Sequence, residues 1–230
     1  MEDSTLTPGL LADPAEQDLS RLDGTLRALA HCIEAAETKE GLTLGEAIDS
    51  LGTSGFCFVS LLLATLFVQP ISLGPLTMAS GGVFMIVGWQ MARGRAHIEL
   101  PEKFRGWHLR GNGWIKVLKL CRRMLVWLAK FTKARMVDWV DGGRGTRNVG
   151  WLIFIGGLLL AIPCGNLPFN NTLPALMVFF AALAWLERDG LMAILSIVWG
   201  FLTLVYFAAA FTLLFWAGSS AWGWLKGWFA

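Results

Sequence analysis

The sequence contains little charge for its length. Charged residues make up 16% of its 230 residues, whereas a soluble domain carries roughly 25%. Hydrophobic residues make up 55%, the mean hydropathy is +0.55, and the apolar residues are gathered into long runs. This composition excludes a disordered tail and a coiled coil, and it argues strongly against a soluble domain. We interpret the chain as an integral membrane protein whose apolar runs lie in lipid.

The motifs of soluble catalytic and metal sites are absent. The four cysteines contain no CxxC pair, which argues against a disulfide framework or a zinc site. The sequence also has no HExxH, no Walker A loop and no GxGxxG. We therefore expect neither an enzyme nor a bound cofactor or metal. A membrane-bound glycosyl or phosphoryl transferase is an alternative, but it would need clustered acids, bases and metal ligands.

A signal peptide is missing as well. Residues 1–18 are acidic and contain neither a basic n-region nor an apolar h-region, so we expect the N-terminus to stay in the cytoplasm. Residues 1–54 carry 3 basic and 11 acidic side chains, a net charge of −8. Residues 93–147 carry 14 basic and 4 acidic ones, a net charge of +10. Because loops rich in Lys and Arg remain in the cytoplasm, we also expect residues 93–147 to be cytoplasmic.

The spacing of apolar residues predicts three helices outside the membrane. Residues 14–37 predict an amphipathic helix with an acidic polar face. Thr43 and Glu46 match a capping box that begins a second, short helix, which ends at Gly52. Residues 113–140 predict a basic amphipathic helix. Its charge excludes a membrane span and suits a cytoplasmic membrane surface that bears anionic lipid.

Two apolar hairpins are each interrupted by a breaker rich in Pro and Gly. The arms of the first are residues 55–69 and 76–92, with the breaker at 70–75. The arms of the second are residues 149–162 and 175–186, with the breaker at 163–174. At about 1.5 Å per residue, the first arm reaches roughly 22 Å, short of the roughly 30 Å hydrocarbon core. Each hairpin is therefore either re-entrant or a kinked element within one bundle.

The second hairpin repeats the landmarks of the first. Gly55 and Gly150 are 95 positions apart, and Trp89 and Trp185 are 96 apart. We interpret this as an internal repeat. The alternative is that any two apolar arms around a Pro/Gly break would align equally well. Both a parallel and an inverted second repeat are compatible with the sequence.

The last apolar run, residues 191–216, carries no formal charge and predicts a transmembrane helix followed by a Trp-rich interfacial anchor. The predicted fold is therefore an all-α integral membrane protein. Its segments are an acidic cytoplasmic N-terminal segment (1–54), hairpin repeat 1 (55–94), a basic amphipathic interfacial segment (95–147), hairpin repeat 2 (148–189), and the final transmembrane helix with its C-terminal anchor (190–230).

Paired, Pro-interrupted apolar segments in two parts of a chain are the pattern of a transporter-like binding site. Helix N-termini after Pro75 and Pro174 would present N–H groups to a phosphate or another anion. The side chains that could contribute to such a site are Ser72, Thr77, Asn166, Asn170, Asn171 and Thr172. The alternative is that both breakers are ordinary turns rich in Asn and Pro.

Charged residues end both hairpins. Arg93 ends the first, and Glu187 and Arg188 end the second. We include these three among the candidate ligand-binding residues, because a charge inside a membrane is usually functional. The alternative is a helix-end cluster in which Arg188 extends to the lipid headgroups while Asp189 and Gly190 make the turn into the last helix.

Four short stretches of this sequence resemble a known family. They are TLGE at 43–46, QMARGR at 90–95, GNLP at 165–168 and LERDGL at 186–191. Together they resemble the bacterial ExoD-type exopolysaccharide synthesis proteins, and the likeness covers roughly residues 43–215. The resemblance implies a bacterial inner-membrane protein connected with making or exporting exopolysaccharide. It supplies no catalytic residues.

We therefore predict a multi-pass inner-membrane protein that binds, and in the fuller form of the hypothesis translocates, an anionic lipid or lipid-linked sugar intermediate. The expected partners are membrane lipids, including a lipid-linked phosphate, and polysaccharide-synthesis proteins. A homo-oligomer is compatible with the sequence, and no nucleic acid is expected. The alternative function is a non-transporting assembly or regulatory partner, which docks polysaccharide enzymes through the acidic N-terminal helix and the basic surface helix.

Overall fold

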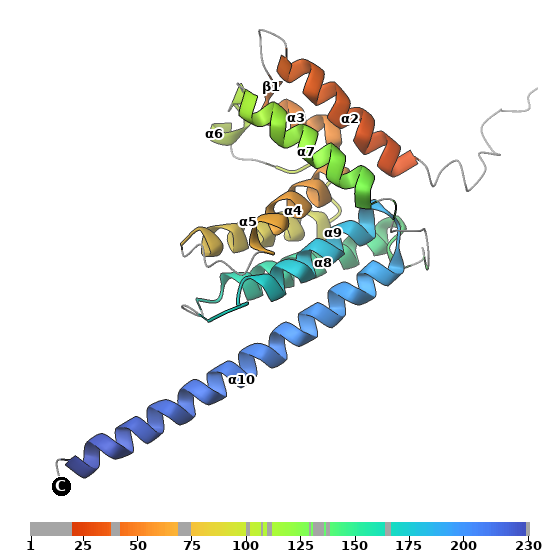
Figure 1. Cartoon of the computed structure of the whole chain (residues 1–230). Coiled ribbons are helices and arrows are strands. Elements are labelled where there is room, and N and C mark those ends of the chain that lie inside the picture. Colours follow the sequence, from red (N-terminus) through yellow and green to blue (C-terminus); the bar gives the residue numbers. More distant parts are fainter. Residues whose placement is uncertain are drawn as a thin grey trace, which may run out of the picture.

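The computed structural model is built almost entirely of helices (Figure 1). It describes residues 20–37, 42–68, 75–99, 102–106, 108–109, 112–128, 130, 136, 139–163 and 167–228. The helices are α2 (Ser20–Glu37), α3 (Leu44–Leu51), α4 (Ser54–Phe67), α5 (Pro75–Ala92), α6 (Glu102–Arg105), α7 (Asn112–Leu128), α8 (Gly142–Ala161), α9 (Thr172–Leu186) and α10 (Gly190–Trp228). Two short strands, β1 (Leu42–Thr43) and β2 (His108–Leu109), pair antiparallel. The all-helical class expected from the sequence is confirmed.

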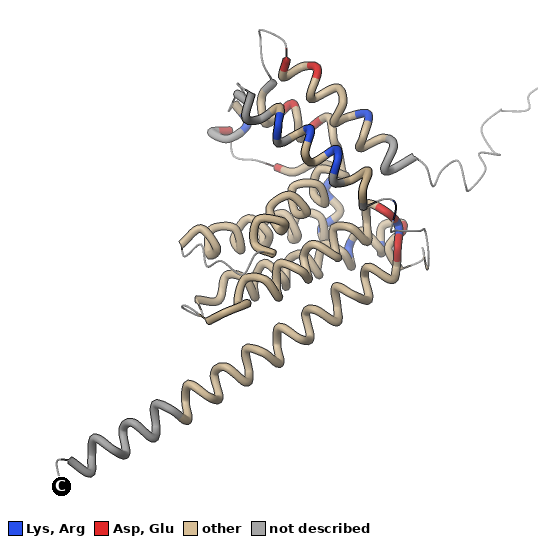
Figure 2. The backbone as a smooth tube through the Cα atoms, viewed as in Figure 1, with Lys and Arg blue, Asp and Glu red and all other residues tan. Residues whose placement is uncertain are grey.

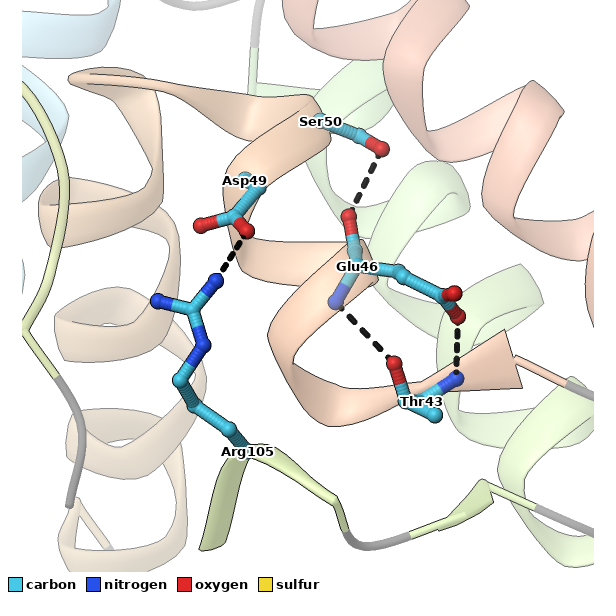
Figure 3. A network of polar contacts seen from close by, with 5 residues as sticks. All are labelled: Thr43, Glu46, Asp49, Ser50 and Arg105. Atoms are coloured by element: carbon cyan, nitrogen blue, oxygen red, sulfur yellow. Dashed lines mark hydrogen bonds and ion pairs between the residues drawn. The ribbon is translucent and has the colours of Figure 1, made fainter. Parts of the chain in front are cut away.

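Helix α3 begins and ends as its local sequence predicts. Thr43 Oγ1 accepts a hydrogen bond from the N–H of Glu46 at 3.2 Å, and Glu46 Oε2 accepts one from the N–H of Thr43 at 2.9 Å (Figure 3). These reciprocal bonds are the predicted capping box. Gly52 ends the helix with a φ of +54°, which favours glycine. An ion pair between Asp49 and Arg105 connects α3 with α6 (Figure 3).

Helices α4, α5, α8 and α9 form a bundle in which α5 packs mainly on α8 and α4 on α9. α5 and α8 run antiparallel and approach closely at glycines spaced seven residues apart on each helix. A Cβ atom on Gly88 would lie 2.5 Å from the backbone nitrogen of Phe154, and one on Gly157 would lie 2.6 Å from Cβ of Phe84. Small residues that let two backbones approach in this way are typical of helix pairs in membranes.

Helix α10 begins at the turn expected at residues 189–190. Asp189 Oδ1 accepts a hydrogen bond from the N–H of Leu191 at 2.9 Å. The first part of α10 packs along α9, where Ser196 Oγ donates to the carbonyl of Met177 at 2.7 Å. The rest of α10 projects beyond the bundle (Figure 1).

One helix among the described residues is long and apolar enough to cross a membrane on its own, and it is the Gly190–Trp216 part of α10. Helices α3 and α4 pass the same test only as a pair, and that pair is bent by 118°. Helix α9 is apolar but shorter. By length and composition, the described part of the chain therefore offers one span, or two if the bent pair counts as one.

Helices α2, α3 and α7 form a second layer, which we call the cap (Figure 1). α2 and α7 run antiparallel (Figure 1), and Lys119 in the middle of α7 pairs with Glu37 at the end of α2, Nζ to Oε1 at 2.8 Å. The apolar sides of the two helices bury each other. The side chains that are at most 1% exposed there are Leu29, Cys32, Cys121 and Leu125. Residues 14–19 of the predicted N-terminal helix lie outside the described residues.

The predicted end of the basic helix was wrong. α7 ends at Leu128 rather than at residue 140, and Met136 has a φ of +49°, which no α-helix accommodates. α8 begins at Gly142, so residues 142–147 form its first turns. The Trp-rich stretch after residue 216 continues the same helix, because α10 runs to Trp228.

Candidate functional site at the helix breaks

The two helix breaks meet at one end of the bundle. Thr77 is the third residue of α5, and Asn171 directly precedes α9. Nδ2 of Asn171 donates a hydrogen bond to Oγ1 of Thr77 at 3.2 Å, and the two residues are 4% and 6% exposed. This buried bond joins the two hairpins across 94 positions of sequence.

The local backbone explains why the Asn171 side chain is available for this contact. Asn171 stands at the N-cap position of α9, yet its side chain makes no capping hydrogen bond. The backbone satisfies the first turn instead, because the N–H of Leu173 donates to the carbonyl of Phe169 and the N–H of Ala175 donates to that of Asn171. α9 begins before Pro174, so the free N–H groups expected after that proline are not found at Ala175.

The last helix contacts the second break. The hydroxyl of Tyr206, the only tyrosine in the sequence, donates to the carbonyl of Pro168. Asn170 and Thr172 are half-buried beside this contact. Ser72 and Asn166 lie outside the described residues. The described polar side chains at the breaks are neutral amides and hydroxyls, which can hydrogen-bond a polar group but do not exchange protons near neutral pH.

The charged candidates lie at the opposite end of the bundle. The Arg188 guanidinium pairs with the carboxylate of Asp141, with side chains 16% and 32% exposed. Asp141 in turn caps α8, because its Oδ1 accepts the N–H of Gly142 at 2.8 Å. Glu187, at the end of α9, is half-buried. This cluster ties the turn between α9 and α10 to the start of α8.

Arg93 lies at the same end and is exposed. Its guanidinium carbon sits 4.5 Å from the ring centroid of Trp89, a cation–π distance. Trp89 also contacts Trp151 of α8 edge to face, with ring centroids 5.6 Å apart. Arg93 therefore belongs to an aromatic cluster on the outside of α5 and α8.

The seven candidate residues that the structure describes lie in two groups at opposite ends of the bundle. α9 has 15 residues, so the breaks and the charged turn are separated by roughly 22 Å. The described candidates at the breaks are Thr77, Asn170, Asn171 and Thr172, and those at the charged end are Arg93, Glu187 and Arg188. Sequence reasoning missed Tyr206 and Asp141. The available signal for Tyr206 was an isolated hydroxyl in an apolar run, and the signal for Asp141 was its position directly before two glycines.

Comparisons with known proteins place this chain among exopolysaccharide proteins. Residues 26–209 match the family described as "Exopolysaccharide synthesis, ExoD". Protein ExoD of Rhizobium meliloti (strain 1021) is 27% identical over 177 residues, which cover 77% of this chain and 73% of that protein. No solved structure matches.

Proposed function

The chain belongs to the ExoD family of exopolysaccharide synthesis, and on this premise we propose that it binds and translocates an anionic lipid or lipid-linked sugar intermediate at the two helix breaks. The proposal includes that the chain is a multi-pass protein of the bacterial inner membrane and that it is not an enzyme. The observation that carries the proposal is the buried contact between Asn171 and Thr77, because polar groups placed deep among apolar helices are costly and usually functional.

The outer faces of the bundle favour a position inside the membrane. Large apolar side chains of α5 and α8 point outward, and among them Leu76 and Ile86 are 55% and 58% exposed, while Leu158 is 46% exposed. Figure 2 shows that charges gather at the cap and at one end of the bundle, whereas the helices between carry almost none. Lipid covers such a surface at less cost than water does.

The lengths of the arms favour re-entrant hairpins. Residues 77–93, 147–161 and 172–187 each span 15 to 17 residues between a break and the charged end, which corresponds to roughly 22–26 Å. The hydrocarbon core is about 30 Å thick. In this arrangement the breaks lie within the membrane, where irregular backbone needs protein partners. Tyr206 supplies one such partner, to the carbonyl of Pro168.

The helix pairing also favours a parallel internal repeat. In such a repeat α4 corresponds to α8, and α5 corresponds to α9. The contact between α4 and α9 then corresponds to the contact between α8 and α5, and both contacts are present. Both breaks lie at the same end of the bundle. The hairpins therefore enter from the same side, which the basic residues 93–147 assign to the cytoplasm.

A lipid-flipping assay tests the proposal. The protein is reconstituted into liposomes with a fluorescent, phosphate-bearing lipid, and the outward movement of the lipid is followed by chemical quenching. The control is Gly82→Ala, because a Cβ at this position of α5 would meet nothing within 4 Å. We expect the wild-type protein and this control both to accelerate flipping. We expect Asn170→Asp, which places a repelling carboxylate at the half-buried edge of the break, to reduce it to the protein-free rate. The absence of flipping of any phosphate-bearing lipid, at verified insertion, contradicts translocation.

We propose the non-transporting assembly partner as the second function, because the cap exposes a highly charged surface. Arg27, His31, Glu34 and Glu37 are exposed on α2. Because the apolar side of α2 packs on α7, a partner would bind this polar face, and removing the whole helix would disrupt the cap. Arg27→Glu/His31→Glu, which makes this face more negative without touching the packed side, is the better test. Unchanged polysaccharide output, at normal protein level, would count against docking through this face.

A further inference from the structure

The cap contains a basic groove between α2 and α7. The groove has a volume of about 440 Å³. Its lining residues are Ala30, Ile33 and Glu34 of α2 and Lys119, Arg122, Arg123 and Val126 of α7. Three cations thus face one carboxylate across a floor of small apolar side chains. This groove lies in the cap, whereas the helix breaks are at the far end of the bundle.

The charge in the groove is incompletely neutralised. Lys119 pairs with Glu37 at 2.8 Å, and both side chains are at least half exposed. Within the described part of the chain, neither Arg122 nor Arg123 forms an ion pair, and both are exposed. Two neighbouring guanidinium groups beside a lysine attract phosphate, because the planar fork of arginine binds phosphate oxygens through two parallel hydrogen bonds.

The surroundings of the groove indicate where the phosphate comes from. The outer face of α7 exposes Leu120 and Trp127 to 62% and 56%, beside the exposed cations Lys116 and Arg123. Exposed Trp and Leu beside basic residues are typical of a helix at a membrane interface. α7 also runs across the direction of α10, and its Lys and Arg lie along its length (Figures 1 and 2).

We propose that the groove between α2 and α7 binds the phosphate of an anionic membrane lipid, with Arg122 and Arg123 as its ligands. Lys119 adds charge at the rim, and Val126 and Ile33 contact the apolar part of the headgroup region. The site tethers the cap to the inner surface of the membrane. It does not depend on the function proposed for the helix breaks.

Lipid retention by the full-length protein tests the site. The protein is assembled in nanodiscs of equimolar phosphatidylglycerol and phosphatidylcholine, released gently, and weighed by native mass spectrometry. We expect Arg122→Gln/Arg123→Gln to reduce retained phosphatidylglycerol roughly 30-fold, from about fivefold for each arginine. The matched control is Arg144→Gln/Arg147→Gln, which removes the same charge from exposed positions on α8 and should leave retention unchanged. Equal losses in both double variants overturn the proposal.

Two further variants make the result specific. Glu34→Gln removes the carboxylate that competes for the arginines, and we expect it to raise retention about two- to fivefold. Asn170→Asp changes only the helix breaks, so in its background Arg122→Gln/Arg123→Gln should still cause the same fold loss of retention, which separates failure of the groove from failure of the proposed function. A soluble source is tested with inorganic phosphate and uridine diphosphate. Thermal stabilisation by either that depends on Arg122, without lipid retention, overturns the membrane assignment.

Discussion

The hydrogen bond between Asn171 and Thr77 is the residue-level contact on which the proposed function depends. Each partner has at most 6% exposure, so removing one leaves the other buried without its bond. We expect Thr77→Val and Asn171→Leu each to lower the free energy of unfolding by about 1–3 kcal/mol.

The double variant provides the sharper test of this contact. Thr77→Val/Asn171→Leu removes both polar groups, so it should cost clearly less than the sum of the two single variants. Unfolding in detergent measures the complete cycle. Strict additivity would mean that the two side chains do not interact in the folded protein.

Burial controls the cysteines of the cap. It raises the pKa of the Cys121 thiol from an ordinary value of 9.0 to about 11, and it raises the pKa of Cys32 as well. The thiolate is the reactive form, so we expect alkylation of Cys121 to accelerate about tenfold per pH unit between pH 8 and 10. Peptide mass spectrometry resolves each cysteine. An exposed reference, Arg144→Cys, should instead level off above about pH 9.

The same shift gives the pH dependence of cap stability. Folding favours the neutral thiol of Cys121. The stability that Cys121 contributes is therefore fully present below pH 9, where its thiol is neutral in the unfolded chain too, and it is lost as the pH rises toward 11. Fast alkylation of Cys121 at pH 7, equal to that of the exposed reference, would contradict its burial.

Local residue features could be predicted, and distant ones could not. Thr43 and Glu46 form the capping box seen in the sequence, and Asp189 accepts the N–H of Leu191 at the start of α10. Both depend only on residues a few positions apart. The pairing of Asn171 with Thr77 depends on how two hairpins dock, so the sequence offered both side chains as candidates without indicating their contact.

At the scale of elements, the crossing of α5 and α8 depends on the absence of side chains. A Cβ at Gly88 would lie within 3.0 Å of backbone atoms of Phe154 and Gly150, whereas one at Gly82 would meet nothing within 4 Å. We expect Gly88→Ala to force the helices apart and to cost about 1–3 kcal/mol. Gly82→Ala should be neutral or stabilising by up to about 1 kcal/mol, because alanine favours a helix. Thermal melting in one detergent compares the two, and equal melting temperatures would contradict the close crossing.

Helix breaks were easier to predict than helix ends. Proline and glycine interrupt both hairpins, and α4, α5, α8 and α9 lie where the apolar arms were expected. The basic helix stops at Leu128 although charged and apolar residues continue to alternate beyond it. An amphipathic pattern records which residues suit a helix, but tertiary packing decides where that helix stops, and Met136 has already left helical geometry.

At the scale of the whole molecule, charged residues are concentrated in the cap and at one end of the bundle (Figure 2). The acidic N-terminal segment and the basic segment looked like two separate surfaces in the sequence. The structure places α2 and α7 against each other in the cap, where their apolar sides are buried together. Periodicity gives the apolar side of each helix but not its partner, so this pairing could not be predicted.

The proposed function requires that the bundle itself, and not only α10, lies in the membrane. The most direct measurement is the accessibility of a nitroxide attached at Ile86, an exposed position in the middle of α5, to oxygen and to a water-soluble nickel complex. Labels at Leu204 of α10 and at Lys116 of the cap serve as the lipid and water references. We predict that the label at position 86 matches Leu204, with high oxygen and low nickel accessibility. A label at 86 that matches Lys116 would contradict the account and leave α10 as a single anchor for a bundle outside the membrane.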